Sequence, residues 1–147
     1  MNSKVILSWF PALFCMGVLF WLSSLPGDQI KLPDFTMSDK VVHFLAYAFL
    51  GWLIYLRHMI QNWGVKSKPQ FSDFKFQLGR LDLWGQLIGI VYGVSDEFHQ
   101  SFVVLRDCSF LDWTADAFGV AFGSWVARLL LKTYRNSVCI SAFTNKG

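Results

Sequence analysis

Residues able to exchange protons or bind ions gather in three short segments of an otherwise apolar chain. Two carboxylates and two histidines can divide the roles of general acid and general base when their surroundings differ. The candidate catalytic residues are Asp39, His43, Asp96, Glu97 and His99. The candidate binding residues are Lys40, Gln100, Arg106, Asp112 and Asp116.

The sequence contains no established metal-binding or nucleotide-binding motif. Histidine with carboxylates suits Zn²⁺ or Mn²⁺, but the run from Asp96 to Gln100 matches no metal-binding motif, and His-Glu-x-x-His is absent. No nucleophile elbow, phosphate-binding loop or dinucleotide fingerprint occurs. The sequence therefore predicts neither a metal site nor a cofactor.

Helical spacing places the ionisable residues on shared faces. Asp39, His43 and Tyr47 are each four residues apart, which puts them on one side of a helix. Two further stripes of small residues adjoin carboxylates: Gly85, Gly89, Gly93 and Glu97 in one, and Asp112, Ala115, Asp116, Gly119 and Gly123 in the other. Small residues let helices approach closely, so the stripes predict that these acids point inward. Plain packing is the alternative for the glycines, and helix capping for Asp112.

The composition indicates where such helices reside. Apolar residues make up 54% of the 147 residues, aromatic residues 18% and charged residues only 16%. Soluble domains carry about 25% charged residues, and disordered chains are polar and poor in aromatics. The net charge of +3 is spread along the chain, so no nucleic-acid-binding stripe is expected. The sequence predicts an integral membrane protein.

Four membrane spans are expected, at about residues 5–26, 40–58, 82–103 and 111–131. They form one domain, 1–135, followed by a short cytoplasmic tail at 136–147, and a polar loop over 61–82 separates the second and third spans. The first span follows from an uncharged run from Val5 to Gly27, because about 20 residues cross a bilayer. A secretory signal peptide is the competing reading, but the run is long and lacks a small-x-small cleavage site. The predicted fold is an all-α four-helix membrane bundle.

Orientation follows from the cations near the span ends. Ten of the 13 Lys and Arg residues belong to the N-terminus, the 61–82 region with its flanks and the C-terminal end. Cations favour the cytoplasmic side, so both termini are predicted to be cytoplasmic. The start of span two, the end of span three and the start of span four then share the outer face, and they carry the candidate residues, with Arg106 in the loop between spans three and four. Ionisable residues inside a membrane usually mark function or a pairing network. A purely structural ion network, in which Lys40 and Arg106 neutralise the acids, is the alternative.

The motif residues resemble those of the VanZ-like family of small bacterial membrane proteins. The matching pieces are Ser23-Ser24-Leu25-Pro26, Asp39-Lys40-x-x-His43-Phe44-x-x-Tyr47, Asp96-Glu97-Phe98-His99-Gln100, Arg106-x-x-Ser109-x-x-Asp112 and Ala115-Asp116-x-x-Gly119-x-x-x-Gly123. Two positions depart from the pattern. Val104-Leu105 replaces the Pro-Gly that usually precedes the arginine, and Asp116 stands where Asn is frequent.

The resemblance implies a multi-pass protein of the bacterial cytoplasmic membrane with a role in the cell envelope. The family is named for a protein linked to teicoplanin resistance, and its general biochemical activity is not settled. The shared site implied by the resemblance comprises Asp39, His43, Glu97, His99, Gln100, Arg106 and Asp112.

The leading hypothesis is an outward-facing polar pocket that binds or modifies an envelope component, such as a lipid-linked or anionic head group. Arg106 and Lys40 would hold the anionic group. Whether the protein is an enzyme stays open. One alternative is a non-catalytic module whose ionic cluster is structural or binds a partner protein. Another is a small proton-coupled carrier, which would need charges deeper in the membrane.

Overall fold

The computed structural model describes residues 3–30, 37–62, 71–106 and 108–144, with side chains in 6–30, 37–57, 83–106 and 108–133. Four α-helices and one 3₁₀ turn, and no β-strand, occur in these ranges. They are α1 (Ser3–Ser23), η1 (Gly27–Gln29), α2 (Ser38–Asn62), α3 (Phe71–Gln100) and α4 (Phe110–Thr144). The all-helical, four-helix prediction is confirmed.

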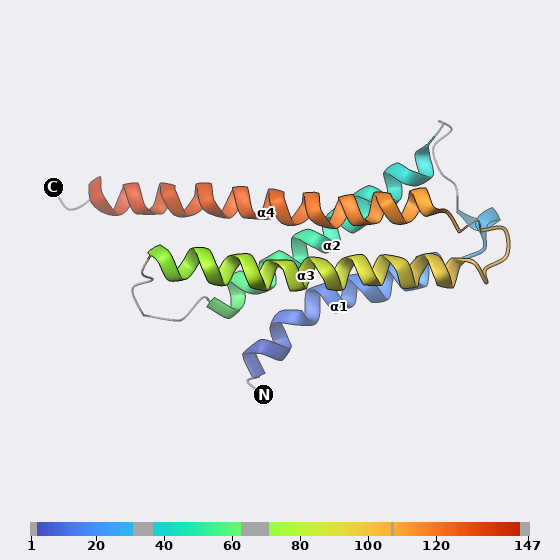
Figure 1. Cartoon of the computed structure of the whole chain (residues 1–147), viewed down its shortest axis with the longest axis horizontal. Helices are drawn as coiled ribbons and strands as arrows, with labels where there is room; N and C mark the ends of the chain where they lie inside the picture. The colour runs from blue at the N-terminus through green and yellow to red at the C-terminus, as the bar shows by residue number, and fades with distance from the viewer. Residues whose placement is uncertain (1–2, 31–36, 63–70, 107, 145–147) are drawn as a thin grey trace.

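The helices alternate in direction (Figure 1). The end of α1, the start of α2, the end of α3 and the start of α4 meet at one end of the molecule. The most extensive contact joins α2 to α4, while α1 packs mainly on α2, and α3 packs on both α2 and α4. This topology brings segments far apart in sequence to one end, as the sequence predicts.

Two helices extend beyond their predicted spans. α3 begins at Phe71, so the prediction of a loop continuing through residues 71–82 is wrong. A polar composition reports contact with water and not loss of helix, and residues such as Lys75, Gln77 and Arg80 are good helix formers. At the other end of the chain, α4 continues to Thr144, so most of the predicted tail is a helical extension.

Glycines allow the closest helix contacts. A Cβ at Gly51 would collide with the backbone of Val120, and one at Gly123 would collide with the carbonyl of Ala48. The seam between α2 and α4 therefore depends on missing side chains, as the small-residue stripe predicts. Tyr47, Leu50, Ile54 and Val120 fill the space along this seam and are almost completely buried.

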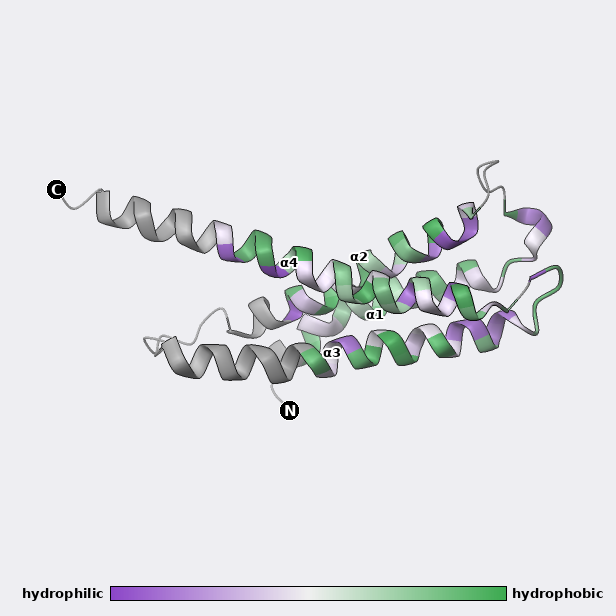
Figure 2. Cartoon of the chain, turned by 45° about the horizontal axis from the view of Figure 1, so that its top comes forward, coloured by the Kyte–Doolittle hydropathy of each residue, from purple (hydrophilic) through white to green (hydrophobic). Residues whose placement is uncertain are grey.

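The outer surface is apolar although the interior holds charged groups. Large hydrophobic side chains are exposed on every helix, among them Leu7, Phe14, Leu45, Leu87 and Phe118. Figure 2 shows hydrophobic residues along the middle of the bundle and hydrophilic ones at the end where α2 and α4 begin. Within the described residues, Ile6–Ser23 and Ser38–Arg57 are long and apolar enough to cross a membrane.

The loop between α3 and α4 contains a strained residue. Leu105 has a φ of 59°, in the left-handed region that favours glycine. This is the position at which the VanZ-like pattern has glycine. The loop packs against η1, where the Gly27 N–H donates a hydrogen bond to Val104 O, and a Cβ at Gly27 would collide with Leu105 O. Leu105 therefore keeps a glycine-like backbone, and the side chain of the next residue, Arg106, turns toward the end of α1.

Candidate functional site

Hydrophilic residues gather at the end of the bundle where α2 and α4 begin (Figure 2), and several of their side chains are buried. We call the following residues the polar cluster: Asp39, Lys40, His43, Asp96, Glu97, Gln100, Asp112 and Asp116. All but Asp39 and Lys40 are less than 9% exposed. The structure thus brings together eight of the ten predicted site residues. The other two, His99 and Arg106, lie at the same end against α1.

His43 lies between two carboxylates supplied by two other helices. Its Nδ1 is 3.0 Å from Asp116 Oδ1 on α4 and 3.6 Å from Glu97 Oε1 on α3. Nε2, on the other side of the ring, is 4.0 Å from Asp39 Oδ1, one helical turn earlier on α2. We call His43, Glu97 and Asp116 the buried triad. It forms the centre of the polar cluster.

Packing fixes the position of Asp116 within the triad. A Cβ at Gly93 would lie 3.1 Å from Asp116 Cβ and 3.2 Å from Asp116 Oδ2. The glycine stripe on α3 therefore leaves the room that Asp116 occupies. Glu97 is held from the loop, because its Oε2 accepts a hydrogen bond of 3.1 Å from the Ser109 backbone N–H.

Lys40 and Asp112 form an ion pair beside the triad. Lys40 Nζ is 2.8 Å from Asp112 Oδ1 and 3.9 Å from Asp39 Oδ2. Asp112 stands in the first turn of α4, but it is Ser109 Oγ that accepts a hydrogen bond from the early N–H of Leu111. The pair with Lys40 therefore accounts for Asp112 better than capping does.

Asp96 has a different role from its neighbour Glu97. Its Oδ1 accepts a hydrogen bond of 2.6 Å from Ser23 Oγ, and its Oδ2 accepts bonds from Tyr47 OH at 3.1 Å and Gln100 Nε2 at 3.4 Å. Both oxygens are satisfied, and they tie α1 and α2 to α3. This geometry favours a structural role over the predicted catalytic one.

His99 and Arg106 contact the end of α1. His99 Nε2 is 3.0 Å from Ser24 Oγ, and its ring lies 4.5 Å from that of Phe20. Arg106 donates hydrogen bonds to the carbonyls of Leu22 and Leu25. Leu22 belongs to the last turn of α1 and Leu25 follows it, so the guanidinium binds where the helix ends. In the described residues Arg106 forms no ion pair with the acids, in contrast to the predicted neutralising role.

Several contributing residues were not predicted as site residues. Ser23 and Ser24 bind Asp96 and His99, and the Ser109 backbone binds Glu97. All three serines stand in the motifs that carry the family resemblance, which was the available signal. Tyr47 was placed on the face of His43 by spacing alone, and its bond to Asp96 needed the tertiary structure.

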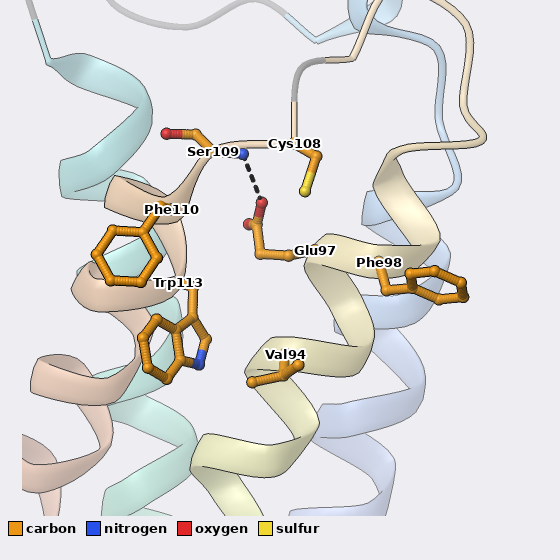
Figure 3. A pocket seen from close by; sticks show the side chains of 7 residues that line it. All are labelled: Val94, Glu97, Phe98, Cys108, Ser109, Phe110 and Trp113. Atoms are coloured by element: carbon orange, nitrogen blue, oxygen red, sulfur yellow. Dashed lines mark hydrogen bonds between the residues drawn. The ribbon is translucent and has the colours of Figure 1, made fainter.

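A pocket opens beside the polar cluster, between α3 and α4 (Figure 3). Its volume is about 460 Å³, and its wall is almost entirely apolar. The lining residues are Val94, Glu97, Phe98, Cys108, Ser109, Phe110 and Trp113. Glu97 belongs to both the pocket and the triad, so it connects the two. The buried Nε1–H of Trp113 donates to no acceptor among the described residues.

The buried triad supports two kinds of chemistry. With a proton on His43 Nδ1, the ring and the two carboxylates can exchange protons with a bound molecule. With Nδ1 unprotonated, one nitrogen and two carboxylate oxygens face a common centre and can bind a cation. The protonation state of His43 Nδ1 decides between the two.

No protein-family model, curated protein or solved structure matches this chain.

Proposed function

We propose that the chain is an integral membrane protein of the VanZ-like kind, in which all four helices cross the bilayer. The support is the reversal of the usual polarity: acids and histidine are buried, while Leu7, Leu87 and Phe118 are exposed. Large exposed apolar patches on a monomer mark contact with a protein or a membrane. Exposed apolar side chains on every helix fit a bilayer better than one docking face.

The polar cluster faces the outside of the cytoplasmic membrane in this proposal. The ten cations at the opposite side favour the cytoplasm, which places both termini there. The cluster then lies at the depth of the outer head groups, where a component of the envelope can reach it.

The proposed role is to bind or modify an amphiphilic, lipid-linked component of the cell envelope. One observation carries this role: Glu97 lines an apolar pocket and at the same time belongs to a buried ionisable triad. A volume of about 460 Å³ is within the range of small-molecule sites. The apolar wall suits a hydrocarbon portion, and the triad suits the polar group attached to it.

The contacts of Lys40 and Arg106 differ from the predicted role of these two residues in holding an anionic group. Lys40 is paired with Asp112, and Arg106 donates to the carbonyls of Leu22 and Leu25, so both cations already have acceptors within the protein. The acids around His43 leave the cluster with an excess of negative charge. The polar group is therefore engaged by hydrogen bonds, by proton exchange or through a cation.

The pocket is tested by filling it. Val94 lines the pocket on α3, so Val94→Trp should block it, whereas Val42→Trp adds the same bulk to an exposed site on α2. Bound amphiphiles are extracted from each purified protein and identified by mass spectrometry. We expect an envelope lipid with the original protein and with Val42→Trp, and its loss with Val94→Trp. Equal retention by both variants, or none by the original protein, would contradict the proposal.

A non-catalytic role is the second candidate, and a specific observation favours it for part of the cluster. Asp96 joins α1, α2 and α3 through three hydrogen bonds, and Lys40 joins α2 to α4. These contacts stabilise the bundle whether or not anything binds. One oxygen of each triad carboxylate, Glu97 Oε1 and Asp116 Oδ2, still accepts no hydrogen bond from a described residue.

A further inference from the structure

The buried triad has the composition and the spacing of a metal site. His43, Glu97 and Asp116 each offer one ligand atom, and the three atoms lie within 4.8 Å of one another. Ligands about 2.0–2.2 Å from a tetrahedral ion are separated by ~3.4 Å. The distances of 3.0 and 3.6 Å from His43 Nδ1 to the two carboxylates are close to this value. Two of the three separations therefore fit ligands of one ion.

Two buried carboxylate oxygens of the triad have no hydrogen-bond donor among the described residues. Glu97 is 4% exposed and Asp116 is completely buried. Glu97 Oε1 and Asp116 Oδ2 accept no hydrogen bond from any described residue. Buried polar groups are normally satisfied, and each exception needs an explanation. Both unsatisfied oxygens belong to the triad, whereas every oxygen of the neighbouring Asp96 has a donor.

The charges near the triad do not compensate its two carboxylates. Lys40 is occupied by Asp112, and Arg106 contacts backbone carbonyls. His43 therefore faces two buried carboxylates with a single ring nitrogen. An uncompensated buried charge is costly, and a divalent cation would supply the charge that the described residues lack.

We infer that the buried triad binds one divalent transition-metal ion of the Zn²⁺ or Mn²⁺ kind. One imidazole nitrogen with two carboxylate oxygens and no thiolate suits these ions. Three protein ligands leave a position open for water or for an incoming oxygen group, as in catalytic sites. Glu97 lines the pocket and also belongs to the triad, so the pocket adjoins the site (Figure 3). The inference depends on the triad geometry and not on the proposed envelope role.

The test measures metal binding by the purified full chain in detergent, without any envelope component. The protein is stripped with a chelator, and Zn²⁺ or Mn²⁺ is then added alone while bound metal and thermal unfolding are followed. We expect one ion per chain and a higher unfolding temperature. Glu97→Gln and Asp116→Asn should each weaken binding about tenfold or more, because changes even beyond the direct ligands have effects of that size.

A matched control separates this site from general attraction to acids. Asp28 is an exposed carboxylate in η1 at the same end of the molecule, and Asp28→Asn should bind the ion like the original chain. Unfolding of each metal-free variant shows whether it is folded before binding is compared. Stoichiometric binding that survives both triad substitutions would overturn the inference. So would the absence of binding by the folded original protein, which would identify the triad as a structural ion cluster.

Discussion

Two adjacent carboxylates on α3 illustrate how differently the cluster uses the same chemistry. Asp96 accepts hydrogen bonds from Ser23, Tyr47 and Gln100 and has no unsatisfied oxygen. Glu97 accepts one from the Ser109 backbone and leaves Oε1 facing His43 without a hydrogen bond. Asp96 therefore links helices, while Glu97 keeps one oxygen, Oε1, without a hydrogen-bond donor.

This contrast predicts that the two amide substitutions destabilise the protein to different extents. Asp96→Asn replaces an acceptor by a donor, so a hydroxyl of Ser23 or Tyr47 loses its partner at a cost of about 1–3 kcal/mol. Glu97→Gln keeps an acceptor for the Ser109 N–H and lowers the repulsion from Asp116, so it should cost less than about 1 kcal/mol. Unfolding of the metal-free proteins in one detergent compares them. If Glu97→Gln were as destabilising as Asp96→Asn, Glu97 would belong to a structural ion network.

Among the elements, α2 and α4 form the framework that carries the triad. Gly51 on α2 and Gly119 and Gly123 on α4 bring the two backbones together, and α3 approaches through Gly85, Gly89 and Gly93. Each stripe begins or ends beside a triad carboxylate. Close backbone packing therefore determines the distances between His43, Glu97 and Asp116.

Two glycine-to-alanine substitutions test how much the close packing of α2 on α4 contributes to stability. Gly123→Ala places a Cβ against the Ala48 carbonyl, and overpacking of this kind costs about 1–3 kcal/mol. Gly17→Ala on α1 meets no atom within 4 Å and should be neutral or stabilising by up to ~1 kcal/mol, because alanine favours helix. Thermal unfolding of the two variants checks the difference. Equal stability would show that α2 and α4 do not pack as closely as described.

Sequence periodicity predicted the helices and their inward faces better than it predicted which side chains contact one another. The interval of four residues correctly placed His43 with Tyr47 and directed Glu97 and Asp116 inward. It did not predict that Asp116 lies nearest His43 or that Arg106 contacts α1 carbonyls. Such pairings join residues 73 and 84 positions apart, and they depend on how helices pack and not on local spacing. The continuation of α3 back to Phe71 was missed because polar residues were read as loop.

At the scale of the whole molecule, the middle of the bundle and the end where α2 and α4 begin differ in polarity. The middle exposes aliphatic and aromatic side chains, while the end where α2 and α4 begin holds the polar cluster (Figure 2). Between Phe110 and Lys132, α4 rises by 1.5 Å per residue, which gives a length on the order of the ~30 Å hydrocarbon core. The two ends of this segment should therefore lie on opposite sides of a bilayer.

Cysteine labelling along α4 tests both the crossing and its direction. Cys108 is exposed just before α4, and Lys132 is exposed toward its far end. In a background with Cys15→Ala and Cys139→Ala, native Cys108 should react with a membrane-impermeant maleimide in intact cells. Lys132→Cys, with Cys108→Ala as well, should react only after permeabilisation, because the cation distribution predicts that this end lies in the cytoplasm. The reverse pattern would invert the orientation and turn the polar cluster toward the cytoplasm. Labelling of both positions in intact cells would show that α4 does not cross the membrane, and the exposed apolar surface would then need a different partner.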